Sequence, residues 1–195
     1  MDIYAPANFS PCRTYRYSLS RSIPRMRERL GLAGAAPSSP RVMVALNLNP
    51  SDANETKPDP TSTRQVGYAE REDCGHLIMV NVWGFVSSTP ETLRAQADPI
   101  GPNNLEHIAA ALAEVKKRGG VVFAGFGAFQ LKRHSEYQHF VRALLIDAGA
   151  VCLGHNANGS PVHPLYQRAD APLVTWDPKR TASARRYVQG LGAVS

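Results

Sequence analysis

The fold of this chain is decided by the stretch RVMVALNLNPS, residues 41–51. Its apolar run, Val42 to Leu46, indicates a buried strand. The loop Asn47-Leu48-Asn49-Pro50-Ser51 follows directly. Such a loop places backbone N–H groups and an amide side chain at the rim of a sheet, where a ligand can reach them.

Two other apolar runs also lead into polar side chains. Leu77 to Val80 is followed by Asn81, and Ala150 to Leu153 comes shortly before His163-Pro164-Leu165-Tyr166. Ligands of open α/β sheets bind beyond the carboxyl ends of the strands. Three polar motifs at three strand ends therefore predict one shared site.

Strand and helix patterns alternate along the chain. Apolar residues at spacings of three and four, from Leu105 to Val115, predict a helix that starts near residue 103 or 104. Gly119-Gly120 ends it. The other helices are predicted at about 63–72 and 135–147, and residues 50–63, with three prolines, are expected to be loop.

Four core strands are predicted, at residues 41–48, 77–82, 121–124 and 151–153. Alternating side chains around Tyr15 and Tyr17 suit a short edge strand, and residues 173–176 suit another. The predicted fold class is therefore α/β, with a central, mostly parallel four-stranded sheet and helices on both faces.

The length of 195 residues fits a single domain, 1–195, in which residues 1–40 form a basic N-terminal segment and linker. No apolar run approaches the roughly 20 residues that a membrane-spanning helix needs. The start, Met1-Asp2-Ile3-Tyr4, lacks the basic-then-apolar order of a secretory signal. We therefore expect a cytoplasmic protein that has no membrane partner.

Neither a metal nor an organic cofactor is indicated. The three cysteines, Cys12, Cys74 and Cys152, are far apart, so they form no disulfide framework, zinc knuckle or iron–sulfur motif. The histidines show no metal-ligand spacing with carboxylates or cysteines. Gly125-Phe126-Gly127-Ala128 lacks the third glycine of a dinucleotide-binding loop. We expect a site without metal or cofactor.

The net charge of +6 points to a polyanionic partner. Arginines concentrate between Arg13 and Arg29, and a second basic group lies between Lys179 and Arg186. A solvated, arginine-rich surface explains the same pattern equally well. The residues predicted to contact phosphates are Arg13, Arg16, Arg64, Arg185 and Arg186.

Each polar motif has a structural and a chemical interpretation. Asn49-Pro50 is a common turn, but the amide of Asn49 can also orient a water molecule. Asp59 is one of the few carboxylates close enough in sequence to act as a base. Asn81 can pair with backbone or with an amide edge of a nucleobase. His163, beside Pro164, is either a surface residue or a donor to developing negative charge.

Taken together, the motifs resemble a bacterial and phage family of unknown function. They are Cys12 to Tyr15, Leu48 to Ser51, Asp59 to Thr61, Val80-Asn81 and Gly159 to Tyr166. At greater distance, their order is similar to that of the uracil-DNA glycosylase superfamily. This resemblance implies the three-layer sandwich of those enzymes.

The resemblance also implies roles for individual residues. Asn49 would position the attacking water with help from Asp59, Asn81 would read the base, and His163 would stabilise the departing base. The residues implied to bind the substrate are Pro50, Ser51, Tyr68, Asn81, Pro164 and Tyr166, with Tyr68 stacking on the base. Ser51 replaces the usual glycine, and Leu165-Tyr166 replaces the Ser-Pro-Leu-Ser that inserts into a duplex.

We therefore expect a hydrolase, similar to DNA glycosylases, that cleaves the N-glycosidic bond of a modified or unpaired base. Single-stranded or modified DNA is the expected partner, since a base inside a stack is out of reach. Two alternatives stay open. One is a module that binds nucleic acid or nucleotides without catalysis, and the other is an N-glycosidase for free nucleosides or nucleotides.

Overall fold

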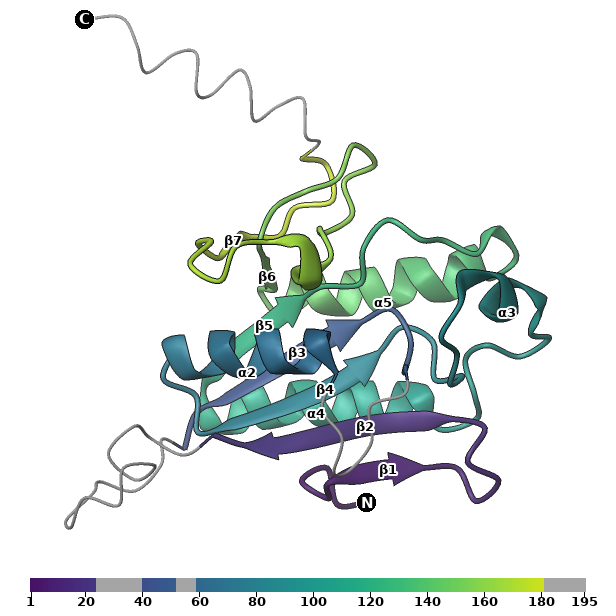
Figure 1. The fold of residues 1–195 in the computed structure, drawn as a ribbon, viewed down its shortest axis with the longest axis horizontal. Coiled ribbons are helices and arrows are strands. Elements are labelled where there is room, and N and C mark those ends of the chain that lie inside the picture. The colour runs from purple at the N-terminus through teal and green to yellow at the C-terminus, as the bar shows by residue number, and fades with distance from the viewer. Residues whose placement is uncertain (24–39, 52–58, 181–195) are drawn as a thin grey trace, which may run out of the picture.

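The computed structural model describes residues 1–23, 40–51 and 59–180. Their strands form one sheet of seven, in the order β1-β2-β4-β3-β5-β6-β7 (Figure 1). The four predicted core strands lie next to one another in its middle and run parallel. They are β4 (His76–Asn81), β3 (Val42–Asn47), β5 (Gly120–Ala124) and β6 (Val151–Cys152).

The predicted number of four strands is wrong, because antiparallel strands extend both sides of this parallel centre. β2 (Arg16–Ser22) pairs with β4, β1 (Ala7–Phe9) pairs with β2, and β7 (Val174–Thr175) pairs with β6. β7 is the edge strand predicted at 173–176. The strand around Tyr17 is not at the edge, since β1 covers it.

Helices cover both faces of the sheet, which confirms the α/β class. They are α2 (Pro60–Arg71), α3 (Pro90–Ala95), α4 (Asn104–Arg118) and α5 (Ser135–Asp147), with short 3₁₀ turns η1 (Lys132–His134) and η2 (Pro164–Tyr166). The predicted helices near 104 and at 135–147 match α4 and α5. In the described part of the chain, no helix has the length and apolarity to cross a membrane.

The start of α2 differs from the prediction. It begins at Pro60 and not near residue 63, so residues 60–63 are helical and not loop. Proline is well tolerated at the first helical position, because the N–H that it lacks has no partner there. Asp59 then caps the helix, and its side chain accepts a hydrogen bond from the backbone N–H of Ser62. The Asp-Pro motif is thus a helix start.

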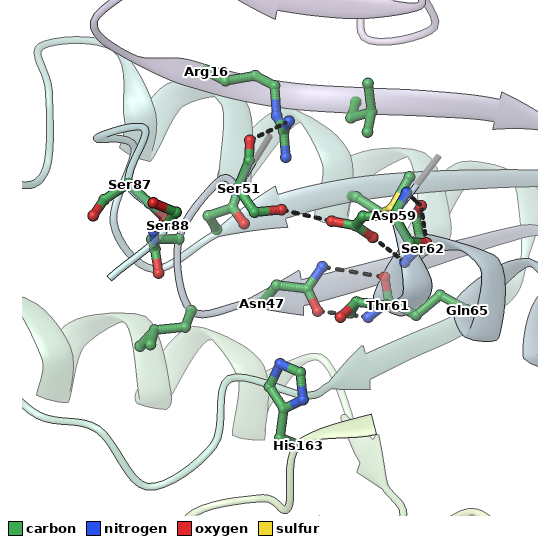
Figure 2. Close-up of a pocket in the computed structure, with 15 residues that line it drawn as sticks. Arg16, Asn47, Ser51, Asp59, Thr61, Ser62, Gln65, Ser87, Ser88 and His163 are labelled. Carbon is green, nitrogen blue, oxygen red and sulfur yellow. Dashed lines mark hydrogen bonds between the residues drawn. The ribbon is translucent and has the colours of Figure 1, made fainter. Parts of the chain in front are cut away.

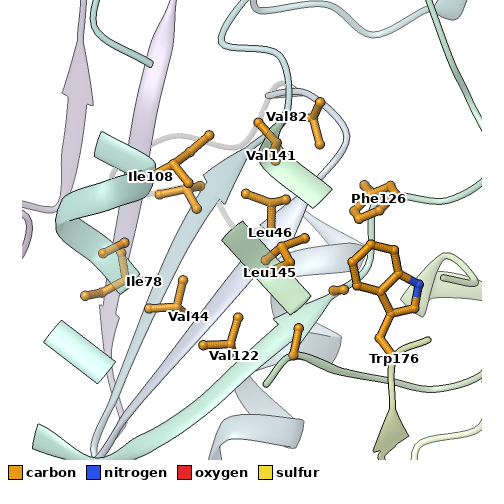
Figure 3. Close-up of a cluster of buried hydrophobic side chains, with 14 of the residues drawn as sticks. Val44, Leu46, Ile78, Val82, Ile108, Val122, Phe126, Val141, Leu145 and Trp176 are labelled. Carbon is orange, nitrogen blue, oxygen red and sulfur yellow. The ribbon is translucent and has the colours of Figure 1, made fainter. Parts of the chain in front are cut away.

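Alternation along β3 divides the core into two clusters. Val44 and Leu46 face α4 and α5, where they pack with Ile108, Val141 and Leu145 (Figure 3). Met43 and Ala45 face α2, in the cluster that contains Tyr68 and Phe123. Asn47, the next residue on the α2 side, is therefore carried to the rim of the sheet on that face.

Candidate functional site

A cavity of about 170 Å³ lies at the carboxyl ends of β3 and β4, on the α2 face (Figure 2). A cavity of roughly 150 Å³ is known to hold one benzene ring, so this space suits a single planar ring. Its lining brings together most of the polar residues singled out in the sequence. Among them are Arg16, Asn49, Ser51, Asp59, Asn81 and His163.

Two neighbouring asparagines line this cavity. Asn47 and Asn81 are register partners at the ends of the parallel strands β3 and β4. Asn81 is only 3% exposed, and its carboxamide makes no hydrogen bond with any described residue. The amide therefore keeps its donors and its acceptor for a group that enters the cavity. Asn81 is therefore available to a ligand.

Asn47 is held in place by Gln65 of α2. The two side chains exchange hydrogen bonds, from Asn47 Nδ2 to Gln65 Oε1 at 3.2 Å and from Gln65 Nε2 to Asn47 Oδ1 at 2.5 Å. Gln65 is fully buried. This exchange fixes which edge of the Asn47 amide is presented to the cavity. Neither residue was among the predicted site residues.

The Asn49 side chain holds its own loop in place through one of its two polar atoms. Its Nδ2 donates to the carbonyl oxygens of Ser87, at 2.7 Å, and of Pro50, at 3.0 Å. Within the described ranges, no donor reaches Asn49 Oδ1. The amide is therefore oriented by the loop, and its oxygen remains an acceptor for water.

Asp59 has both carboxylate oxygens engaged. Oδ1 accepts from the Ser62 N–H at 2.6 Å and Oδ2 from the Ser51 hydroxyl at 2.6 Å. Burial alone would raise the pKa of Asp59, but these hydrogen bonds outweigh it and the pKa lies below its usual value. Asp59 is thus a cap that stays ionised at the wall of the cavity, and this makes it a weak proton acceptor.

His163 points into the cavity from the opposite side, toward Asn47 (Figure 2). Its Nδ1 accepts a hydrogen bond from the backbone N–H of Leu165 at 3.3 Å. The proton of the neutral ring must then lie on Nε2. Burial lowers the pKa of His163, although the charge of Asp59 acts in the opposite direction. His163 is therefore a neutral hydrogen-bond donor.

The arginines predicted to bind phosphates do not form one surface. Arg16 is 5% exposed and lies inside the cavity, where Nη1 donates to the Ser51 carbonyl at 3.3 Å. Arg13 lies over the ring of Phe9. Arg64 donates to the Gln167 carbonyl at 2.9 Å. Arg185 and Arg186 lie outside the described residues.

Two aromatic residues and two prolines of the predicted site do not line the cavity. Tyr68 is 2% exposed and packs on Phe123 in the core, so it is not in position to stack on a ligand there. Tyr166 is 80% exposed, with its ring centroid 5.6 Å from that of His163. Pro50 and Pro164 are buried and shape the adjoining turns.

Several lining residues were missed in the sequence. Gln65 could have been found, because it lies three and four residues before Tyr68 and Ala69 and so shares a helical face with them. Ser87 and Ser88 follow β4 in a loop that has no distinctive pattern. In the described part of the chain, no cluster of three His, Cys, Asp or Glu residues could hold a metal ion.

Comparison with known proteins agrees with the resemblance to a family of unknown function. Neither the curated proteins nor the solved structures contain a match to this chain. A family described as "Protein of unknown function (DUF1643)" matches residues 16–165, which include β2 to β6 and every described residue that lines the cavity. Because this match covers most of the length of the chain, the chain belongs to the DUF1643 family of proteins of unknown function.

Proposed function

We propose that the chain hydrolyses an N-glycosidic bond and that the cavity at the ends of β3 and β4 receives the base. The observation that carries this proposal is the position of a neutral histidine donor, His163, opposite two carboxamides across a space for one ring. Carboxamides offer both donors and an acceptor, which complements the amide edge of a nucleobase.

The polar groups divide the chemistry between them. Asn81, with Asn47 beside it, holds the edge of the base. As the glycosidic bond breaks, electrons move onto the base, and His163 Nε2–H donates to that developing negative charge. The Asn49 Oδ1 orients the water that attacks the oxocarbenium-like sugar carbon, and the anionic Asp59 stabilises the positive charge there.

The geometry favours a base that is already out of a stack. The cavity is lined by residues of β2, α2 and the His163 turn, and its volume suits one planar ring, so a base has to leave its stack before it can enter. Modified or unpaired bases cost the least to extrude. Single-stranded or base-modified DNA is therefore the substrate class that we test first.

The test is product analysis with base-modified single- and double-stranded DNA and with free nucleosides. We expect free base from the wild type, and a loss of about 10²–10³-fold in His163→Ala, the usual effect of removing one preorganised donor. Asn103→Ala, which removes an amide at the residue before α4 and outside the cavity lining, is the control. Release of no base from any substrate, or equal release by His163→Ala, would overturn the proposal.

A further inference from the structure

A second cavity, of about 290 Å³, is lined by residues of η1 and α5 and of the segment before them. The helix α5 covers the face of the sheet opposite α2 (Figure 1). The polar lining of this cavity contains no carboxylate, and every polar side chain in it is able to donate a hydrogen bond. These side chains are Gln130, Lys132, Ser135, Gln138, His139 and Arg142. The composition is that of a site for an anion.

Arg142 is the first residue whose surroundings favour a bound anion. It is half-buried, and its guanidinium carbon lies 6.0 Å from the centroid of the Phe126 ring. Among the described residues it has neither a carboxylate partner nor a hydrogen-bond acceptor. Burial lowers the pKa of Arg142. A partly buried cation gains most from a counter-ion that shares its environment.

Gln138 supplies a preoriented donor beside it. The side chain is 9% exposed, and its Oε1 accepts from the backbone N–H of Leu131 at 2.8 Å. That bond fixes the amide and leaves Nε2 without an acceptor among the described residues. Since Gln138 lines the cavity, this N–H group is available to a ligand bound there.

The remaining donors come from one helical stripe and the turn before it. Ser135, Gln138, His139 and Arg142 follow the spacing of three and four that places side chains on one face of α5. Lys132 of η1 lines the same cavity. Arg133 is excluded, because it donates to carbonyl oxygens of the α3 segment. The acidic Glu136 of α5 is not part of the lining.

The two cavities share no lining residue, but a small space of about 10 Å³ borders both of them. Gln138 and Arg142 line this small space together with Leu48, and Leu48 lines the cavity at the ends of β3 and β4. An anion on α5 would thus lie beside the ring-sized cavity, on the opposite side of the β3 loop.

We propose that the α5 cavity binds a phosphate group, with Arg142 and Lys132 supplying the charge and Gln138 and Ser135 supplying hydrogen bonds. The phosphate belongs either to the backbone of a nucleic acid or to a free phosphate or nucleotide. The site is defined without reference to glycosidic cleavage, so it can be tested whether or not any base is released.

The first experiment measures Tm against the concentration of inorganic phosphate, with chloride at matched ionic strength as the reference. We expect a saturable rise of Tm in the wild type, since a ligand that binds the folded state stabilises it. Arg142→Gln should lose that rise. Lys132→Gln, at an exposed position that is safe for folding, should weaken it. Lys117→Gln, an exposed cation on α4, should behave like the wild type.

The second experiment measures binding of a single-stranded oligothymidylate at several salt concentrations. A phosphodiester ligand predicts that Arg142→Gln lowers the slope of log K against log salt by about 0.7, the value for one lost phosphate contact. An unchanged slope, with the phosphate effect on Tm still lost, identifies free phosphate or a nucleotide. No rise of Tm in the wild type, or an equal rise in Arg142→Gln and Lys132→Gln, would refute the site.

Discussion

At the scale of single residues, the cavity combines one ionised carboxylate with neutral donors and amides. Asp59 is kept anionic by Ser51 and by the N–H of Ser62, while burial keeps His163 neutral. Both pKa values are lowered, and this leaves a negative charge on the Asp59 carboxylate but an uncharged ring at His163. The two groups therefore have different tasks, because one presents a negative charge and the other a proton. The state of Asp59 depends on Ser51 and on the N–H of Ser62 at the start of α2, and the state of His163 depends on burial by the surrounding fold.

Asp59 makes the stability of the protein depend on acid. Its folded pKa lies below the unfolded value of about 3.9, so its stabilising effect is complete above that value and is lost as the pH falls through the folded pKa. Asp59→Ala should lower the free energy of unfolding near neutral pH by roughly 0.5–2 kcal/mol, the usual cost of a lost cap. Denaturant melts of both proteins from pH 7 to pH 3 measure it.

The difference between wild type and Asp59→Ala should shrink in the most acidic samples. Asp147→Ala, at the exposed end of α5, is the control and should shift stability by less than about 0.5 kcal/mol. A difference that grows toward low pH would contradict the assignment of Asp59 as a stabilising carboxylate.

His163 makes the proposed reaction depend on pH in a defined direction. Its folded pKa is lowered by burial, so the neutral ring persists below the ordinary value of about 6.5. We expect the rate of base release to stay level from pH 8 through that value and to fall only in more acidic solution. Single-turnover rates across this range test it, and a rate that rises as the imidazolium forms would exclude a neutral donor.

At the scale of elements, α4 fixes the end of β4. Asn104, fully buried in its first turn, donates from Nδ2 to the carbonyl oxygens of Asn81, at 2.9 Å, and of Val82, at 3.1 Å. Tyr137 of α5 also donates to the Val82 carbonyl, at 2.9 Å. The strand end that carries Asn81 is therefore held by two helices from the face opposite the cavity.

Asn104→Ala should consequently destabilise the protein by about 1–3 kcal/mol, because buried carbonyls lose their donor. Asn103→Ala provides a matched control, since the side chain of Asn103 makes no capping hydrogen bond to α4. Its free energy of unfolding should change by less than about 0.5 kcal/mol. Equal effects of the two substitutions in denaturant melts would show that the strand end does not need Asn104.

The elements themselves were largely readable from the sequence, whereas their contacts across the chain were not. Leu105, Ile108 and Leu112 identify α4 by spacing alone, and the run from Val42 identifies β3. The exchange between Asn47 and Gln65 depends on how α2 docks on the sheet, which no local pattern encodes. The start of α2 differs from the prediction because Pro60, which the sequence pattern places in a loop, is the first residue of the helix.

At the scale of the whole molecule, the sheet is completed by strands outside the family match. β1 and β7 lie beyond residues 16–165, and Trp176 follows β7 directly. Trp176 is 3% exposed and packs edge-on against Phe126, with ring centroids 5.5 Å apart (Figure 3). Its Nε1 donates to the Gly159 carbonyl at 3.1 Å, which ties β7 to the segment that leads to His163.

Trp176 is therefore expected to stabilise the core and the site wall together. Trp176→Ala should cost roughly 3–5 kcal/mol, the range for a large buried aromatic. Trp176→Phe keeps an aromatic ring but lacks the N–H, so it should lose at least the 0.5–1.5 kcal/mol of one hydrogen bond. Tyr166→Ala, at an 80% exposed aromatic, should stay within about 0.5 kcal/mol of wild type. Denaturant melts of the three variants measure these losses in the free energy of unfolding. If Tyr166→Ala loses as much stability as Trp176→Ala, then η2, and not β7, closes this end of the core.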